Sequence, residues 1–322
     1  VEGVVYPGTL DGQGGVDTLN FSALSGDHTI TLTGYGSIDG YNGVHSVITG
    51  GFNNINALIG SAQNDTLIGA NQDTTWKVTE SDAGTLDNIF TFQAIEKLVG
   101  SNASDSLDYS SYANALDIQV TGAGSVDGYA GTEDASLSVG FDNMNALLGT
   151  VNDDRLTAFD IVNSWEITAA NAGTLNSIFN FSSIEELVGG SDSDSLDYSS
   201  YATALDIEVT RAGSVDGYAG TDASLGVGFD NMNTLQGTSN NDSLTAFGID
   251  NVWKITAANE GSLNDILTFK SIEKLVGGSI KDTLDYSNYT NALDIQVTGA
   301  GSIDGYAGTD ASLGVGFDNM NT

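Results

Sequence analysis

Residues 105–112 read Asp-Ser-Leu-Asp-Tyr-Ser-Ser-Tyr, and the same eight residues stand again at 194–201. A close copy, Asp-Thr-Leu-Asp-Tyr-Ser-Asn-Tyr, occupies 282–289, and a divergent copy begins at Asp17. Successive copies are 88 or 89 residues apart, and self-similarity at a fixed period is the signature of a repeat architecture. We therefore predict one continuous array over 1–322, with approximate repeats at 9–96, 97–185, 186–273 and the incomplete 274–322.

Each repeat divides again at a shorter element, Gly-x4-Asp-x-Leu, which returns after about 40 or 48 residues. The element begins at Gly12, Gly60, Gly100, Gly149, Gly189, Gly237 and Gly277. One extra residue, Glu133, lengthens the second repeat, and an insertion tolerated at that point predicts a loop.

Short β-strand patterns fill the spaces between these elements. Residues 116–120, Leu-Asp-Ile-Gln-Val, alternate apolar and polar side chains as a half-buried strand does, and 205–209 and 293–297 repeat the pattern. Turn formers such as Asp127-Gly128 separate the strands, and no stretch keeps a helical period. The pattern predicts an all-β protein.

Short strands, regular turns and a long period favour a parallel β-solenoid, a β-roll or β-helix, with one apolar core. We expect coils of roughly 20 residues, two to each half-repeat. An array of β-sandwich domains is the structural alternative, but the Asn-Gly pairs typical of tight antiparallel hairpins are missing.

Composition narrows the possible partners. The formal net charge is −35, with 8 Lys+Arg against 43 Asp+Glu, which excludes nucleic acid and argues against an anionic membrane surface. The apolar runs are too short to insert into a membrane. Without cysteine, neither disulfides nor cysteine metal sites can form.

The segment Gly-Gln-Gly-Gly-Val-Asp-Thr-Leu at 12–19 resembles the nonapeptide of RTX (repeats-in-toxin) proteins. The strings Asp-Ser-Leu-Asp-Tyr-Ser-Ser-Tyr, Trp-x-Ile-Thr-Ala-Ala-Asn and Ile-Glu-x-Leu-Val-Gly-Gly resemble the divergent RTX-like repeats of large bacterial surface adhesins. The resemblance covers the chain from about Thr9 onward. It implies an extracellular, cell-surface stalk with a β-roll or β-solenoid fold and calcium as its cofactor.

Carried over by position, the resemblance implies that one aspartate of each Gly-x4-Asp element binds Ca²⁺. These residues are Asp17, Asp65, Asp105, Asp154, Asp194, Asp242 and Asp282. Carboxylates, turn carbonyls, Asn and Ser supply the hard oxygen ligands that Ca²⁺ takes. The alternative is that each aspartate accepts backbone N–H groups within its own turn.

Aromatic residues repeat with the same period. Trp76, Trp165 and Trp253 lie in alternating strands, where a core position is the main expectation and stacking on a sugar ring the alternative. The tyrosine pairs are expected to form ladders with their hydroxyls at the surface. They are Tyr109/Tyr112, Tyr198/Tyr201 and Tyr286/Tyr289.

Catalysis is not expected, because an active site is normally one constellation and nearly every candidate acid here is repeated. His28 and His45 occur only in the first repeat. The sequence thus predicts a structural stalk or filament of an extracellular bacterial surface protein. The alternatives are a self-assembling filament subunit, stacked end to end on further copies, and a module that binds cell-surface polysaccharide.

Overall fold

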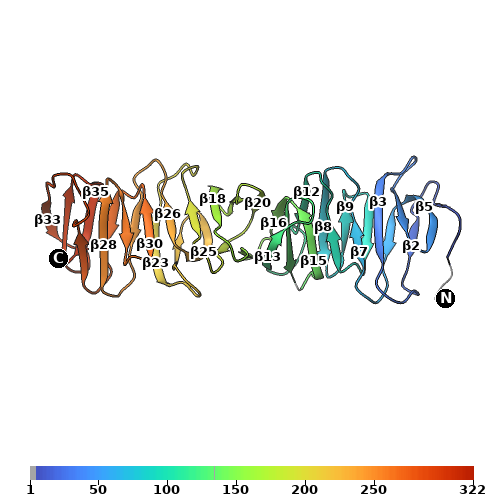
Figure 1. The fold of residues 1–322 in the computed structure, drawn as a ribbon, viewed down its shortest axis with the longest axis horizontal. Coiled ribbons are helices and arrows are strands. Elements are labelled where there is room, and N and C mark those ends of the chain that lie inside the picture. Colours follow the sequence, from blue (N-terminus) through green and yellow to red (C-terminus); the bar gives the residue numbers. More distant parts are fainter. Residues whose placement is uncertain (1–4, 134) are drawn as a thin grey trace. The chain divides into compact units, whose positions relative to one another are not determined.

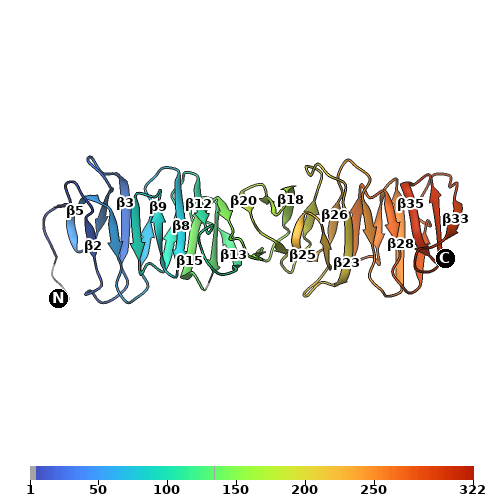
Figure 2. The same cartoon turned by 180° about the vertical axis from the view of Figure 1, so that it is seen from behind.

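The computed structural model describes residues 5–133 and 135–322, and within these ranges it contains strands and no helix. The predicted fold class is confirmed, because the strands form two sheets, A and B, with mostly parallel pairing and no closed barrel. Contacts divide the chain into unit 1, residues 1–156 with 178–183, and unit 2, residues 157–177 with 184–322. Figures 1 and 2 show the two units from opposite sides, with successive strands side by side in each unit.

Sheet A combines short single strands with three-stranded antiparallel meanders. The single strands are β1 (Leu10–Asp11), β7 (Thr66–Ile68), β11 (Lys97–Val99), β17 (Arg155–Thr157), β21 (Glu186–Val188), β27 (Ser243–Thr245) and β31 (Lys274–Val276). The meanders are β3 (Thr29–Tyr35), β4 (Tyr41–His45) and β5 (Ile48–Ile55); β13 (Asp117–Ala123), β14 (Tyr129–Glu133) and β15 (Leu137–Met144); β23 (Asp206–Ala212), β24 (Tyr218–Asp222) and β25 (Leu225–Met232); and β33 (Gln296–Ala300), β34 (Tyr306–Asp310) and β35 (Leu313–Met320).

Sheet B is built in the same way. Its single strands are β2 (Thr18–Asn20), β6 (Ala57–Ile59), β12 (Asp105–Asp108), β16 (Ala146–Leu148), β22 (Ser195–Asp197), β26 (Thr234–Gln236) and β32 (Asp282–Asp285). Its longer groups are β8 (Thr74–Glu80), β9 (Ala83–Leu86) and β10 (Phe90–Gln93); β18 (Ser164–Ala169), β19 (Ala172–Leu175) and β20 (Phe179–Ser182); and β28 (Asn251–Ala257), β29 (Glu260–Leu263) and β30 (Leu267–Lys270).

The two units use the same strand order in sheet A and share the central six-strand order of sheet B, β2-β6-β10-β9-β8-β12 in unit 1 and β22-β26-β30-β29-β28-β32 in unit 2. In unit 1, sheet A runs β1-β5-β4-β3-β7-β11-β15-β14-β13 and sheet B runs β2-β6-β10-β9-β8-β12-β16-β20. In unit 2, sheet A runs β21-β25-β24-β23-β27-β31-β35-β34-β33 and sheet B runs β19-β18-β22-β26-β30-β29-β28-β32.

The meanders correct the expected coil length. Leu67 of β7 pairs in parallel with Leu98 of β11, 31 residues later, and Leu98 pairs with Phe141 of β15, 43 residues later. One coil therefore takes 31–43 residues by this register, and not the roughly 20 residues that were predicted. The added length is the antiparallel excursion that follows the entering strand.

The hairpin turns explain why the meanders were not predicted. Between β13 and β14 the chain turns at Asp127-Gly128, where the Gly124 N–H donates to the Gly128 carbonyl over 2.9 Å and Gly128 has φ +53°. In sheet B the left-handed residue of the tight hairpin is Asp82 (φ +51°), Asn171 (φ +53°) or Asn259 (φ +56°), without a following glycine that would mark it. Asparagine adopts this conformation more readily than most residues. The search for Asn-Gly pairs missed these hairpins for that reason.

Apolar side chains at equivalent positions stack from coil to coil. Ile30, Leu67 and Leu98 follow one another in sheet A, while Trp76, Leu107 and Leu147 do so in sheet B. All of these side chains are buried. At about 25 cal/mol per Å² of apolar surface, this repeated core is the main stabilising contribution, and every coil adds a similar increment. The prediction that the inserted residue, Glu133, lies in a loop is wrong: Glu133 is the last residue of β14, pairs with Leu137 of β15 and is buried.

Candidate functional site

The aspartates predicted to bind calcium lie at turns between the sheets, and six of the seven are buried. Only Asp17 is half-exposed. The structure brings no two of these seven together; each stands at the turn of its own coil. The part of the chain that the structure describes contains no group of three or more His, Cys, Asp or Glu side chains that could hold a metal ion.

Each buried aspartate joins its own turn to the preceding coil. Asp242 shows the geometry: one carboxylate oxygen, Oδ2, accepts the Thr238 N–H over 2.6 Å, and the other, Oδ1, accepts the Leu205 N–H over 2.7 Å. Asp154 repeats this with the Thr150 and Leu116 N–H groups. Hydrogen bonds to a charged, buried acceptor are among the stronger ones in proteins. This arrangement, which we call the aspartate clasp, is the turn-capping alternative weighed above, and it occupies carboxylate oxygens that a metal would need.

The clasp also explains the glycine of Gly-x4-Asp. A Cβ on Gly237 would stand 2.1 Å from the Ser271 carbonyl oxygen and 2.8 Å from Asp242 Oδ2. On Gly149 it would stand 2.0 Å from the Ser183 carbonyl oxygen. Ser271 and Ser183 have φ of +50° and +54°, so their left-handed backbone aims a carbonyl at the glycine. A side chain at the glycine would separate the two coils.

Burial raises the pKa of several clasp aspartates. Desolvation raises the pKa of Asp105 and Asp154, while their hydrogen bonds oppose it. Desolvation likewise raises the pKa of Asp194 and Asp282 to about 6.

The tryptophans confirm the core prediction. Trp76, Trp165 and Trp253 are fully buried, so none of them can present a ring face to a sugar. The prediction for the tyrosine hydroxyls was wrong in two places. Tyr109 accepts a hydrogen bond from Ser136 at 3.0 Å inside the protein, and the Tyr198 hydroxyl donates to Asp222 at 2.5 Å. A buried tyrosine hydroxyl needs a polar partner, and the meander supplies it.

The first repeat differs from the others in its histidines. His28 takes the place of Leu116, since its N–H donates to Asp65 Oδ1 over 2.7 Å. Its side chain lies 3.2 Å from His45, which stacks on Phe21 with 4.3 Å between ring centroids. Desolvation, followed by repulsion from His28, lowers the pKa of His45 to about 4.

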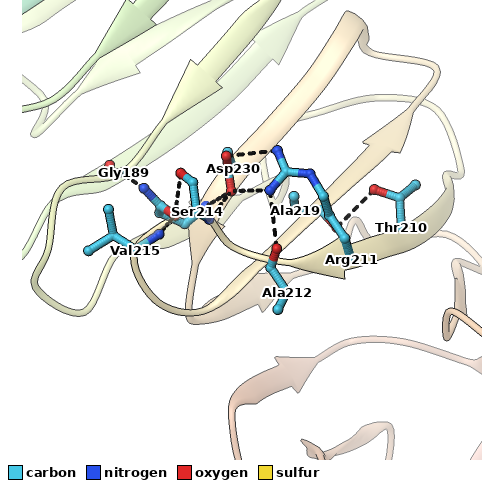
Figure 3. A network of polar contacts seen from close by, with 9 residues as sticks. Gly189, Thr210, Arg211, Ala212, Ser214, Val215, Ala219 and Asp230 are labelled. Carbon is cyan, nitrogen blue, oxygen red and sulfur yellow. Dashed lines mark hydrogen bonds and ion pairs between the residues drawn. The ribbon is translucent and has the colours of Figure 1, made fainter. Parts of the chain in front are cut away.

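One ion pair was not foreseen from the sequence. Arg211 of β23 contacts Asp230 of β25, and the same carboxylate accepts the Ser214 N–H over 3.0 Å. Figure 3 shows this network beside Val215 and Gly189. The equivalent of Arg211 in the neighbouring repeats is glycine, so the repeat pattern itself gave no signal for it.

Comparison of the chain with models of protein families, with curated proteins and with solved structures gives no match. The resemblance to RTX-like repeats therefore stays a prediction. Among the residues that the structure describes, no helix is long and apolar enough to cross a membrane.

Proposed function

We propose that this chain is the repetitive stalk or filament region of an extracellular, calcium-stabilised bacterial surface protein of the adhesin type. Its task is mechanical: it spaces a binding region from the cell or builds an extracellular filament. The observation that carries the proposal is the aspartate clasp, because each of the six buried aspartates accepts a hydrogen bond from the preceding coil at the equivalent position. A catalytic or binding site would need a unique constellation, whereas here the same contacts recur.

Stability in such an array is approximately a sum over coils and their interfaces. Each interface between coils combines stacked, buried apolar side chains, such as Leu67 and Leu98, with a clasp hydrogen bond, such as the one that Asp242 accepts from the Leu205 N–H. The acidic composition, with 43 Asp+Glu among 322 residues, supports an exposed, soluble array that takes up cations. The RTX-like sequence strings support placement at the cell surface.

Single-molecule force spectroscopy with handles at the two ends tests the mechanical role. We expect stepwise unfolding in which the released lengths are multiples of one coil, 31–43 residues by the register of β7, β11 and β15. At about 3.5 Å per residue that is roughly 110–150 Å per step. A single low-force event that releases the whole chain would contradict a load-bearing array. Antibody labelling of intact cells tests the location, and labelling that requires permeabilisation would contradict it.

Association with a further repeat is a second candidate, and one observation favours it. Ile295, just before β33, and Val297 within it are 47% and 59% exposed. Their equivalents in β23, Ile207 and Val209, are buried, and β27 pairs with β23. The face of β33 thus has the shape and apolarity that suit another half-repeat of this type. Concentration-dependent association that Val297→Lys abolishes supports end-to-end assembly; a monomer at all concentrations, unaffected by the substitution, argues against it.

A further inference from the structure

The first repeat departs from the recurring contacts at the turn of the β3–β4 hairpin. Tyr41, which follows that turn, is a tyrosine in every repeat, but its surroundings change. Four residues differ around it in the first repeat: Tyr35, Asn42, Gln72 and Asp87. The equivalent residues are Ala123, Ala130, Ile161 and Asn176 in the second repeat, and Ala212, Ala219, Ile249 and Asn264 in the third. Four changes around one side chain indicate a role that the repeated scaffold does not need.

Hydrogen bonds fix the position of Tyr35. Its hydroxyl donates to Asp87 Oδ2 over 3.1 Å, and its backbone carbonyl accepts the Asn42 side-chain amide over 3.0 Å. The Tyr41 hydroxyl donates to the same Asp87 oxygen over 2.6 Å. The rings of Tyr35 and Tyr41 lie 5.0 Å apart between centroids. Tyr41 is fully buried but Tyr35 is 52% exposed, so an aromatic ring of fixed position is presented to solvent.

The third repeat buries the equivalent tyrosine, Tyr218, without an exposed aromatic ring beside it. Phe247 lies 5.5 Å from Tyr218 between ring centroids, and the Asn264 amide donates to the Tyr218 hydroxyl over 2.9 Å. The first repeat has Ala70 in place of this phenylalanine. Its tyrosine therefore has an aromatic neighbour at the surface, Tyr35, and a carboxylate in place of the amide. Packing alone does not require this exchange, since the neutral set of residues also buries the tyrosine.

The Asp87 carboxylate has no cationic partner among the described residues. Its Oδ1 accepts the Thr75 N–H over 2.8 Å, and its Oδ2 accepts the two tyrosine hydroxyls. These bonds fill three of the about four acceptor positions of a carboxylate. One position is thus left for a positively charged donor, in a chain whose net charge of −35 attracts cations.

We propose that Tyr35, Gln72 and Asp87 bind an amino sugar of a polysaccharide, with the pyranose ring on Tyr35 and the ammonium group toward Asp87. A tyrosine of fixed position offers a large contact area at low entropic cost, and its ring attracts a cation over its face. Gln72 Nε2 lies 3.5 Å from the Tyr41 hydroxyl, a weak contact that leaves the amide available to a sugar hydroxyl. The negative charge of the chain excludes acidic polysaccharides.

This site goes beyond the mechanical role, because a stalk would unfold stepwise with or without a bound sugar. It also differs from the sugar stacking considered for the tryptophans, which are all buried. The site belongs to the first repeat only, since the later repeats have alanine at the position of Tyr35.

Calorimetric titration of the full chain at pH 6 with a β-1,4-linked glucosamine hexamer, most of whose amines are then protonated, tests the proposal. Y35A and D87N each introduce the residue that the third repeat has at that position, Ala212 or Asn264, which the fold accepts there. We expect Y35A to bind the hexamer about fivefold more weakly than the wild type, or weaker still. D87N keeps an oxygen acceptor for the tyrosine hydroxyls but should lose the preference for the glucosamine hexamer over its N-acetylated form.

Hexalysine is the control for the general attraction of cations to an acidic chain, and it should bind Y35A and the wild type equally. Equal affinity of Y35A and the wild type for the glucosamine hexamer would overturn the proposal, because charge alone would then explain the binding. Equal affinity of the wild type for maltohexaose, a neutral sugar, would also overturn it, because the carboxylate would then take no part in recognition. A wild-type chain that does not bind the glucosamine hexamer would do the same.

Discussion

Arg211 Nη2 lies 2.8 Å from Asp230 Oδ2, and this ion pair takes the place of a lysine contact found in other coils. In unit 1, Lys97 of β11 lies 3.7 Å from Asp142, the equivalent carboxylate. In unit 2, Lys274 of β31 is the equivalent lysine and Asp318 the equivalent carboxylate. Burial raises the pKa of Asp318, but hydrogen bonds from Ser302 and Asn319 and the charge of Lys274 lower it by more, so that its pKa lies below the usual value. In β21 the lysine position is Glu186, and the cation comes instead from β23. The carboxylate at this position is thus paired with a cation either from the single strand, as with Lys97 of β11, or from the meander, as with Arg211 of β23.

Removing the cation should weaken this site measurably. R211M keeps the apolar stem but leaves the buried Asp230 without its ion pair, and we expect a loss of about 1 kcal/mol in the free energy of unfolding. Urea denaturation at low and high salt measures it, and the loss should shrink at high salt. R211K, which keeps a charge, should retain part of the stability. An R211M chain as stable as the wild type at low salt would show that the Ser214 and Asn231 N–H groups satisfy the carboxylate without a cation.

The clasp at Asp242 should be far more costly to remove. D242A leaves the Thr238 and Leu205 N–H groups without an acceptor inside the protein, and we expect a loss of about 2–4 kcal/mol. Denaturant titration of D242A against D294A, a substitution at an exposed aspartate, provides the comparison. Similar stability of the two variants would show that water replaces the clasp.

The close approach at the clasp glycine gives a test with an internal control. G237A places a Cβ 2.1 Å from the Ser271 carbonyl oxygen, so the two coils must separate, and we expect a loss of several kcal/mol or failure to fold. At Gly299 nothing lies within 4 Å of the added Cβ, so G299A should change stability by less than about 1 kcal/mol. Equal effects of the two substitutions would remove the structural reason for the glycine of Gly-x4-Asp.

Acidification should act in opposite directions at two sites, around His45 in unit 1 and around Asp194 and Asp282 in unit 2. The pKa of His45 falls from 6.5 to about 4 on folding, so His45 binds fewer protons in the folded state between these values, and its contribution to stability falls as pH falls through them. The pKa of Asp194 and Asp282 rises from 3.8 to about 6 on folding, so these two residues bind more protons in the folded state, and their contribution to stability rises as pH falls toward 4.

Hydrogen exchange followed by mass spectrometry at pH 7 and pH 5, corrected for intrinsic rates, resolves the two effects. H45F should remove the acid-dependent loss of protection around β4, and D194N/D282N should remove the acid-dependent gain around β22 and β32. Parallel changes in both units would contradict these assignments.

The repeat period and the apolar alternation predicted the fold class and the buried tryptophans, because both depend on local pattern. The sequence also located every clasp aspartate, but it could not show the partner. The group that Asp242 accepts from, the Leu205 N–H, is 37 residues away, and that distance depends on the register of a coil whose length was misjudged. Asp127, in the turn between β13 and β14, was predicted only as a turn former, since its neighbours in space are set by the same register. Arg211 escaped notice because it replaces a glycine of the repeat pattern in one place only.

The identity of residues 105–112 with 194–201 has a consequence for how such a chain changes length. A deletion that fuses Asp105 to Ser195 leaves the local sequence unaltered, and Asn233 then inherits the role that Asn145 holds beside Asp105. No new interface has to evolve, because the residues at both ends of the excised segment make equivalent hydrogen bonds with their neighbouring coils. Recombination between copies can therefore lengthen or shorten the array in steps of one repeat, while each remaining coil keeps equivalent neighbours. The length of the array can thus change by inheritance without any change of fold.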